Sequence, residues 1–150
     1  MVKKISELYL EARRAFLTVE DEHTSSLLAR NLLCFLTGKS QEEILANREM
    51  YTSEEICFKM EDAVKRILEG EPIAYILGEW DFYGMRIFLD KNVLIPRDDT
   101  CAVADLAIKQ SLFLDSKPRI LDLCTGSGCI GLAIASRVKD AKVTLADLSQ

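Results

Sequence analysis

The glycine-rich stretch at residues 119–133 constrains the fold of this chain more than any other feature. Residues 119–123 are typical of a buried β-strand, a glycine turn follows, and an apolar helix starts after the turn. A second apolar segment, residues 142–147, is typical of the next strand. Acidic side chains close both strands, Asp122 the first and Asp147 the second. This order predicts an α/β domain that holds a nucleotide-like ligand on the turn.

Composition narrows the class of protein. With 49% hydrophobic and 29% charged residues over 150 positions, the chain is expected to be globular, with one or two small domains. It has neither an apolar run long enough to span a bilayer nor a signal peptide, so we expect a cytoplasmic protein with no membrane partner.

The five cysteines include no Cys-x-x-Cys pair, which argues against a metal site. The net charge of −5 argues against direct nucleic-acid binding.

Residues 1–71 are predicted to form an all-helical bundle. Apolar residues recur there at helical spacing, and Gly38 is expected to end the second helix. Two further helices are expected after Ser40 and Thr52, because each hydroxyl is followed three residues later by glutamate, the pattern of a capping box. The last of these helices is expected to stop at Gly70.

Between this bundle and the glycine turn the pattern changes to that of strands. Residues 79–83 and 85–89 are aromatic-rich and flank Gly84, which predicts a β-hairpin within a linker at residues 72–97. The next helix is expected to be capped by one of three polar residues: Asp98, Asp99 or Thr100. Residues 98–150 then form the α/β domain.

Two ligands fit a glycine turn between acids. The turn satisfies G-x-G-x-x-G, and Asp147 follows at about the spacing of a ribose-binding acid, so a nicotinamide or flavin dinucleotide must be considered. Asp122, however, would repel the doubly anionic pyrophosphate of a dinucleotide. S-adenosylmethionine has no phosphate, and its ammonium and sulfonium suit a carboxylate. Asp122 therefore favours the methyl donor, while Asp147 suits the ribose of either ligand.

The predicted cofactor-binding residues lie on and beside the turn. In chain order they are Asp122, Thr125, Gly126, Ser127, Gly128 and Asp147. The two hydroxyl residues among them are expected to contribute mainly backbone amides. Without a ligand, the same pattern is a tight strand-to-helix turn in a structural α/β domain. His23, the only histidine, lies among acids near a helix start, and we assign it no catalytic role.

Residues 121–130 resemble the donor loop of protein-(glutamine-N5) methyltransferases, which modify peptide chain release factors. Upstream, residues 72–84 are similar to the linker hairpin of that family, and residues 93–97 match its Val-Leu-Ile-Pro-Arg signature. The resemblance implies a helical substrate-recognition domain, a β-hairpin linker and the first half of a Rossmann-like class I methyltransferase sheet. It also implies S-adenosylmethionine as cofactor, S-adenosylhomocysteine as product and a release factor as protein substrate.

The chain departs from the family pattern in two places. After Pro96 and Arg97 the family usually continues with proline, an acid, threonine and glutamate, whereas residues 98–101 read Asp-Asp-Thr-Cys. The Asn-Pro-Pro-Tyr motif, which holds the acceptor amide in such enzymes, does not occur in residues 1–150. No catalytic residue can therefore be assigned in this chain.

A class I methyltransferase sheet has about seven strands, and this chain supplies two. We therefore expect the chain to be about the first half of a longer protein, inactive by itself, with an open sheet edge that favours self-association. Two alternatives stay open. One is a non-enzymatic helical interaction module with a vestigial half-domain, and the other is a methyltransferase for another protein or for a nucleic-acid amino group.

Overall fold

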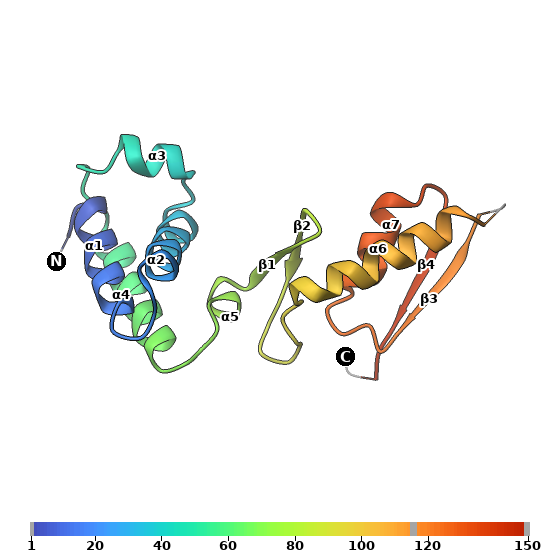
Figure 1. Ribbon diagram of the computed structural model, residues 1–150. Coiled ribbons are helices and arrows are strands. Elements are labelled where there is room, and N and C mark those ends of the chain that lie inside the picture. The colour runs from blue at the N-terminus through green and yellow to red at the C-terminus, as the bar shows by residue number, and fades with distance from the viewer. Residues whose placement is uncertain (1, 115–116, 149–150) are drawn as a thin grey trace. The chain divides into compact units, whose positions relative to one another are not determined.

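The computed structural model describes residues 2–114 and 117–148, and the chain divides into two compact units. The first, Met1–Leu77, is here called the helical unit, and the second, Gly78–Gln150, the α/β unit. Figure 1 shows the order of the elements. The helical unit contains α1 (Ile5–Phe16), α2 (Glu22–Thr37), α3 (Gln41–Ala46), α4 (Glu54–Leu68) and α5 (Ile73–Leu77). The α/β unit contains β1 (Glu79–Phe82), β2 (Met85–Phe88), α6 (Asp98–Leu112), β3 (Arg119–Leu123), α7 (Cys129–Arg137) and β4 (Lys142–Ala146).

The helical unit is built around an apolar core shared by α1, α2 and α4, which lie together in Figure 1. Each of these helices turns one apolar face inward, because its hydrophobic residues recur every three or four positions. The buried side chains include Leu8, Ala12, Phe16, Ala29, Leu32, Leu33, Met60 and Ala63. The predicted all-helical fold of this part of the chain is confirmed.

The end of α2 at Gly38 and the start of α3 after Ser40 lie where the sequence predicts them. Asp21 precedes α2, and its carboxylate accepts hydrogen bonds from the backbone amides of His23 and Thr24 at 2.8 and 3.0 Å. Gly38 ends α2 in the left-handed conformation, at φ 66°. Ser40 forms the expected capping box with Glu43 at the start of α3.

The second predicted capping box, at Thr52, is wrong. The cap of α4 is Ser53, whose side chain accepts a hydrogen bond from the amide of Ile56 at 3.2 Å. The Thr52 hydroxyl instead donates to the carbonyl of Lys3 at 2.9 Å, and the Thr52 amide donates to the same carbonyl. A contact between segments distant in the sequence thus uses the hydroxyl that the local pattern assigns to the helix.

We expect Ser25→Ala to stabilise the helical unit by about 1 kcal/mol. The Ser25 hydroxyl is fully buried in α2, and within the described residues it has no hydrogen-bond partner. Alanine removes a buried unsatisfied polar group and has the higher helix propensity. Urea unfolding followed by circular dichroism measures the change, with the exposed Ser136→Ala as control. A loss of stability in Ser25→Ala would contradict the conclusion that the Ser25 hydroxyl makes no hydrogen bond.

The hairpin forms as predicted, with each strand one residue shorter than expected. β1 and β2 pair antiparallel, and the turn between them consists of Tyr83 and Gly84 at φ 58° and 73°. Two positive φ values match the right-handed twist of the flanking strands. The single-turn helix α5 was not predicted, since five residues are too few for a helical period to emerge. Its apolar side chains pack against the core of the helical unit.

Tyr83 anchors the hairpin inside the α/β unit. Its hydroxyl donates to the carboxylate of Asp105 on α6, and this hydrogen bond raises the pKa of the Tyr83 hydroxyl. The guanidinium of Arg137 on α7 lies 5.3 Å from the centre of the Tyr83 ring. The ring also packs against the small buried core of this unit, which comprises Ile108, Ile134 and Val138. One side chain therefore joins the hairpin to both helices of this unit.

The helix α6, which follows the hairpin, starts at Asp98, so none of the three predicted residues precedes it as a cap. Arg97 is the N-cap of α6, with extended backbone at φ −94° and no side-chain cap bond. The predicted caps Asp98, Asp99 and Thr100 all lie inside the first turn, so that prediction is wrong. The two acids instead stabilise the positive end of the helix dipole from within.

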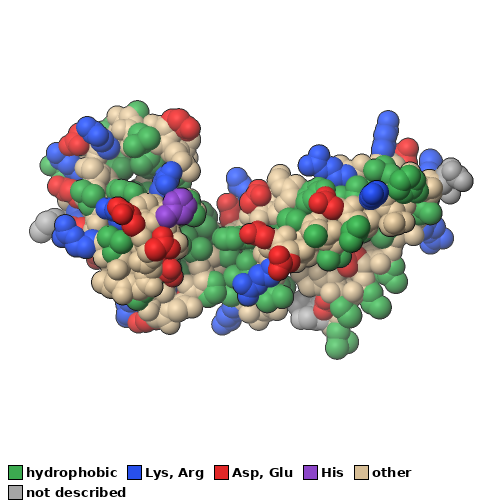
Figure 2. Space-filling view, viewed as in Figure 1, with side chains coloured by type: hydrophobic (Ala, Val, Ile, Leu, Met, Phe, Trp, Pro, Cys, Tyr) green, Lys and Arg blue, Asp and Glu red, His purple; other side chains and the backbone are tan. Residues whose placement is uncertain are grey.

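β3 and β4 form a parallel pair in which Asp122 lies opposite Leu145. One face of the pair carries α6 and α7, and Ile120 and Val143 pack there against the small core of this unit. On the other face Leu121 and Leu123 are 61% and 68% exposed, and Figure 2 shows apolar side chains on the surface of this unit in green. The predicted fold, a helical part, an antiparallel hairpin and parallel α/β strands, is confirmed.

Candidate functional site

The glycine turn joins β3 to α7 through an unusual run of left-handed backbone. Cys124, Gly126 and Gly128 adopt φ values of 59°, 54° and 77°. The amide of Gly128 donates to the carbonyl of Thr125 at 2.9 Å, which closes the turn. Glycine takes this conformation without strain, whereas a residue with a Cβ, such as Cys124, is disfavoured there. The amides of Thr125, Gly126 and Gly128 all donate to acceptors within the α/β unit.

Asp122 holds the turn from behind. Its Oδ2 atom accepts hydrogen bonds from the Thr125 hydroxyl at 2.7 Å and from the Gly131 amide at 2.9 Å. Gly131 lies in the first turn of α7, where the helix dipole favours a negative charge. The carboxylate thus links the end of β3 to both the glycine turn and the helix that follows.

Gly131 makes this contact possible by having no side chain. A Cβ built on Gly131 would lie 2.2 Å from Leu145 Cδ2 and 2.9 Å from Asp122 Oδ2. Both distances are shorter than van der Waals contact, so a larger residue would force Leu145 to turn away and Asp122 to move. The third glycine of the motif is needed here for close packing of helix on sheet.

Asp147 reaches the same turn from the neighbouring strand. Its Oδ2 atom accepts a hydrogen bond from the Gly126 amide at 2.8 Å. Just before it, the carbonyl of Ala146 accepts from the Thr125 amide at 3.1 Å. The parallel register of β3 and β4 brings the carboxyl ends of both strands, and both acids, to one glycine turn.

A cavity of about 560 Å³ lies beside the turn within the α/β unit. This volume is in the range of small-molecule sites. Its lining comes from the glycine turn, from the residue after β4 and from the segment that leaves β2: Gly126, Ser127, Asp147, Phe88, Leu89, Asp90, Asn92, Val93 and Leu94. Both polar and apolar groups are therefore available to a ligand.

Three of the six predicted site residues line the cavity, and three do not. Gly126, Ser127 and Asp147 line the cavity, whereas Asp122 and Thr125 bond to each other behind it. Gly128 is buried at the start of α7. The Thr125 amide donates to the carbonyl of Ala146 on β4, and the Thr125 hydroxyl donates to Asp122.

Residues 88–90 and 92–94 supply the rest of the cavity lining. None of them is among the predicted site residues, although residues 93 and 94 begin the Val-Leu-Ile-Pro-Arg signature. Asp90 caps a local turn by accepting from the Asn92 amide at 2.8 Å. The Asp-x-Asn spacing signals this turn, but it does not tell which cavity the turn faces. That information comes only from the packing of the hairpin inside the α/β unit.

Metal-binding clusters and membrane-spanning helices are both absent from the described part of the chain. In residues 2–114 and 117–148, no group of three or more His, Cys, Asp or Glu side chains is arranged to hold a metal ion. Over the same described ranges, no helix has the length and apolar character that crossing a bilayer requires.

Comparison with known proteins agrees with these features. The family described as "PrmC N-terminal domain" matches residues 7–78. A release factor glutamine methyltransferase of Haemophilus influenzae is 42% identical over 118 residues, covering 76% of this chain and 40% of the relative. The enzyme of the same name from Escherichia coli is 37% identical, over 79% of this chain and 42% of the relative. The one from Vibrio cholerae is 33% identical, over 95% of this chain and 49% of the relative.

The chain thus spans less than half the length of each of these relatives. The family model covers most of the helical unit, and the match to the Vibrio cholerae relative, over 142 residues, takes in most of the α/β unit as well. Over the part of the relatives that it spans, the chain belongs to the family of release factor glutamine methyltransferases.

Proposed function

We propose that this chain carries the donor-binding part of an S-adenosylmethionine-dependent methyltransferase that methylates a glutamine side chain of peptide chain release factors. The observation that carries the proposal is the pair of carboxylates, Asp122 and Asp147, bound to one glycine turn beside a cavity of about 560 Å³. The release factor as protein partner is inferred from the names of the relatives. We infer that the reaction takes place in the cytoplasm.

The charges of the site suit the methyl donor. Asp147 lines the cavity, where its carboxylate can accept hydrogen bonds from the ribose hydroxyls. Asp122 lies behind the turn, where both of its hydrogen bonds end on Oδ2, and we assign to its negative charge, without direct contact, the attraction of the donor's ammonium group. A dinucleotide would place its pyrophosphate close to the same two carboxylates, at an electrostatic cost.

In this proposal the residues of the chain bind and orient. S-adenosylmethionine, when bound, supplies an electrophilic methyl group on sulfur, and the acceptor is an amide nitrogen whose lone pair is delocalised. The glycine turn and Asp147 hold the ribose end, while residues 88–94 wall the cavity and exclude water. We assign residues 1–71 to substrate recognition, 72–97 to a linker and 98–150 to donor binding. None of the 150 residues is assigned a catalytic role.

Calorimetric titration of the chain with S-adenosylhomocysteine tests the donor site, with a nicotinamide dinucleotide as the control ligand. We expect a micromolar dissociation constant for the product, about −8 kcal/mol, and no heat from the dinucleotide. Binding of the dinucleotide alone would overturn the proposal. Binding of neither ligand would contradict a working donor site in this chain and favour a non-enzymatic interaction module.

Asp147→Ala is expected to weaken binding of S-adenosylhomocysteine by about tenfold or more, because a carboxylate hydrogen-bonded to ribose is worth roughly 1.5–3 kcal/mol. Isothermal titration of the variant measures the loss. Asp81→Ala, which removes an exposed acid on β1, serves as the matched control and should bind as the unmodified chain does. Unchanged affinity in Asp147→Ala would remove the ribose role of this residue.

A further inference from the structure

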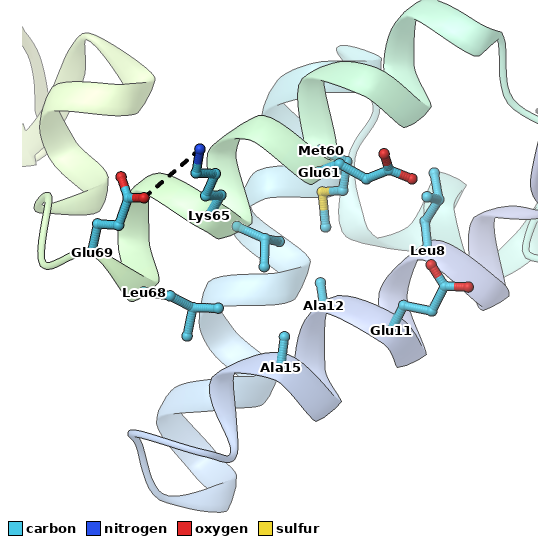
Figure 3. A pocket seen from close by; sticks show the side chains of 10 residues that line it. Leu8, Glu11, Ala12, Ala15, Met60, Glu61, Lys65, Leu68 and Glu69 are labelled. Carbon is cyan, nitrogen blue, oxygen red and sulfur yellow. Dashed lines mark ion pairs between the residues drawn. The ribbon is translucent and has the colours of Figure 1, made fainter.

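An apolar groove of about 470 Å³ runs between α1 and α4 in the helical unit. Figure 3 shows the side chains that line it. Its floor consists of Leu8, Ala12 and Met60, which are 2%, 3% and 2% exposed. The groove is hollow because α1 contributes alanines where α4 contributes larger side chains. Neither the donor cavity nor the glycine turn forms any part of it.

The rim of the groove is acidic. Three acids line it, Glu11 of α1, Glu61 of α4 and Glu69 at the C-cap of α4, and Lys65 lies among them. Lys65 Nζ lies 3.9 Å from Glu69, the ion pair drawn as a dashed line in Figure 3. At that distance between exposed groups the pair is weak. The rim therefore has an excess of negative charge around an apolar floor.

A cation already occupies part of this rim. Lys3 Nζ donates to Glu11 at 2.7 Å and to Glu61 at 3.1 Å, so one ammonium group joins acids from both helices. These two hydrogen bonds raise the pKa of Lys3. The two carboxylates are thus close enough together to hold one positive charge between α1 and α4.

We propose that this groove docks an amphipathic segment of a protein partner, with aliphatic side chains on the apolar floor and a lysine or arginine at the acidic rim in the place of Lys3. The charge of the rim and the seat that Lys3 occupies select a basic segment over an acidic one. The apolar floor favours a helix that repeats its aliphatic residues every three or four positions. The proposal goes beyond the donor site and does not depend on it.

The test uses the full chain and a synthetic amphipathic helix of about 14 residues, four turns long, with leucines on one face and lysines beside them. A peptide with glutamate in place of each lysine is the control. We expect the lysine peptide to bind and to shift the amide signals of α1 and α4 in ¹H–¹⁵N spectra, while the glutamate peptide does not. Shifts confined to α3 or to the α/β unit, or equal binding of the two peptides, would overturn the proposal.

Lys3→Met is a second test, because this variant should bind the lysine peptide more tightly than the unmodified chain does. Without the ammonium of Lys3, Glu11 and Glu61 are released to the peptide, and we expect affinity to rise about two- to fivefold. Lys39→Met makes the same change in net charge at an exposed position outside the groove. If both variants bound the peptide equally more tightly, the change in net charge alone would explain the effect. That result would contradict a binding position for the peptide's cation between Glu11 and Glu61.

Ala15→Phe tests the apolar part of the groove. Ala15 is half-buried at the groove wall, so a phenylalanine there can fill the hollow and is expected to lower peptide affinity about tenfold. Circular dichroism confirms that the variant is folded, and a folded variant that binds normally would overturn the proposal. S-adenosylhomocysteine titrated into the same samples reports on the donor site separately, so failure of either idea leaves the other measurable.

Discussion

Asp122→Ala is expected to reduce binding of S-adenosylhomocysteine by about 100-fold and to destabilise the α/β unit by about 2 kcal/mol. Alanine removes the acceptor shared by the Thr125 hydroxyl and the Gly131 amide, which lie 2.7 and 2.9 Å from Asp122 Oδ2. It leaves both donors without that partner and frees the glycine turn from the helix behind it. Calorimetry measures the affinity, and urea unfolding measures the stability.

Asp122→Asn separates the two roles of this residue. The amide oxygen of asparagine can still accept from Gly131, so the α/β unit should keep most of its stability, whereas the negative charge assigned to the donor's ammonium is lost. We therefore expect Asp122→Asn to bind the product about tenfold more weakly in a domain of nearly normal stability. Normal affinity in this variant would show that Asp122 only holds the turn.

Gly131→Val is expected to cost the α/β unit about 1–3 kcal/mol and to abolish measurable product binding. Even the first added carbon would meet Leu145 Cδ2 at 2.2 Å and Asp122 Oδ2 at 2.9 Å. Leu145 is 41% exposed and can turn away, but Asp122 is held by two hydrogen bonds and must move with the turn. Thermal unfolding and calorimetric titration measure the two losses.

Ala135→Val is the matched control for this substitution. It places the same β-branched side chain on the exposed side of α7, where it meets no strand, and should change stability by a few tenths of a kcal/mol through helix propensity alone. If Gly131→Val behaved like this control, the close approach of α7 to β3 and β4 would not be needed for the site. Comparing Gly131→Val with Ala135→Val therefore separates the effect of packing against the strands from the effect of valine on helix stability.

Local chemistry explains why the sequence predicted so much of the fold. The helices of the first unit, the hairpin and the parallel strands each carry their own period of apolar residues, and periods of 3.6 and 2 are readable without tertiary information. Gly38 and Ser40 mark helix ends because the bonds that they make lie within three residues. Predictions failed where the deciding contact is distant, as at Thr52, whose hydroxyl bonds to the carbonyl of Lys3.

In the candidate site, too, local features could be predicted from the sequence and long-range contacts could not. By itself the sequence determined the glycine turn, the two acids at strand ends and the family, because these features follow from residue types at short spacing. Only the tertiary structure decided that Asp122 lies behind the turn, that residues 88–94 face Asp147 across a cavity, and that alanines on α1 leave a groove against α4. Those arrangements depend on how separate elements pack, and packing is set by side-chain volumes that meet only in the folded chain.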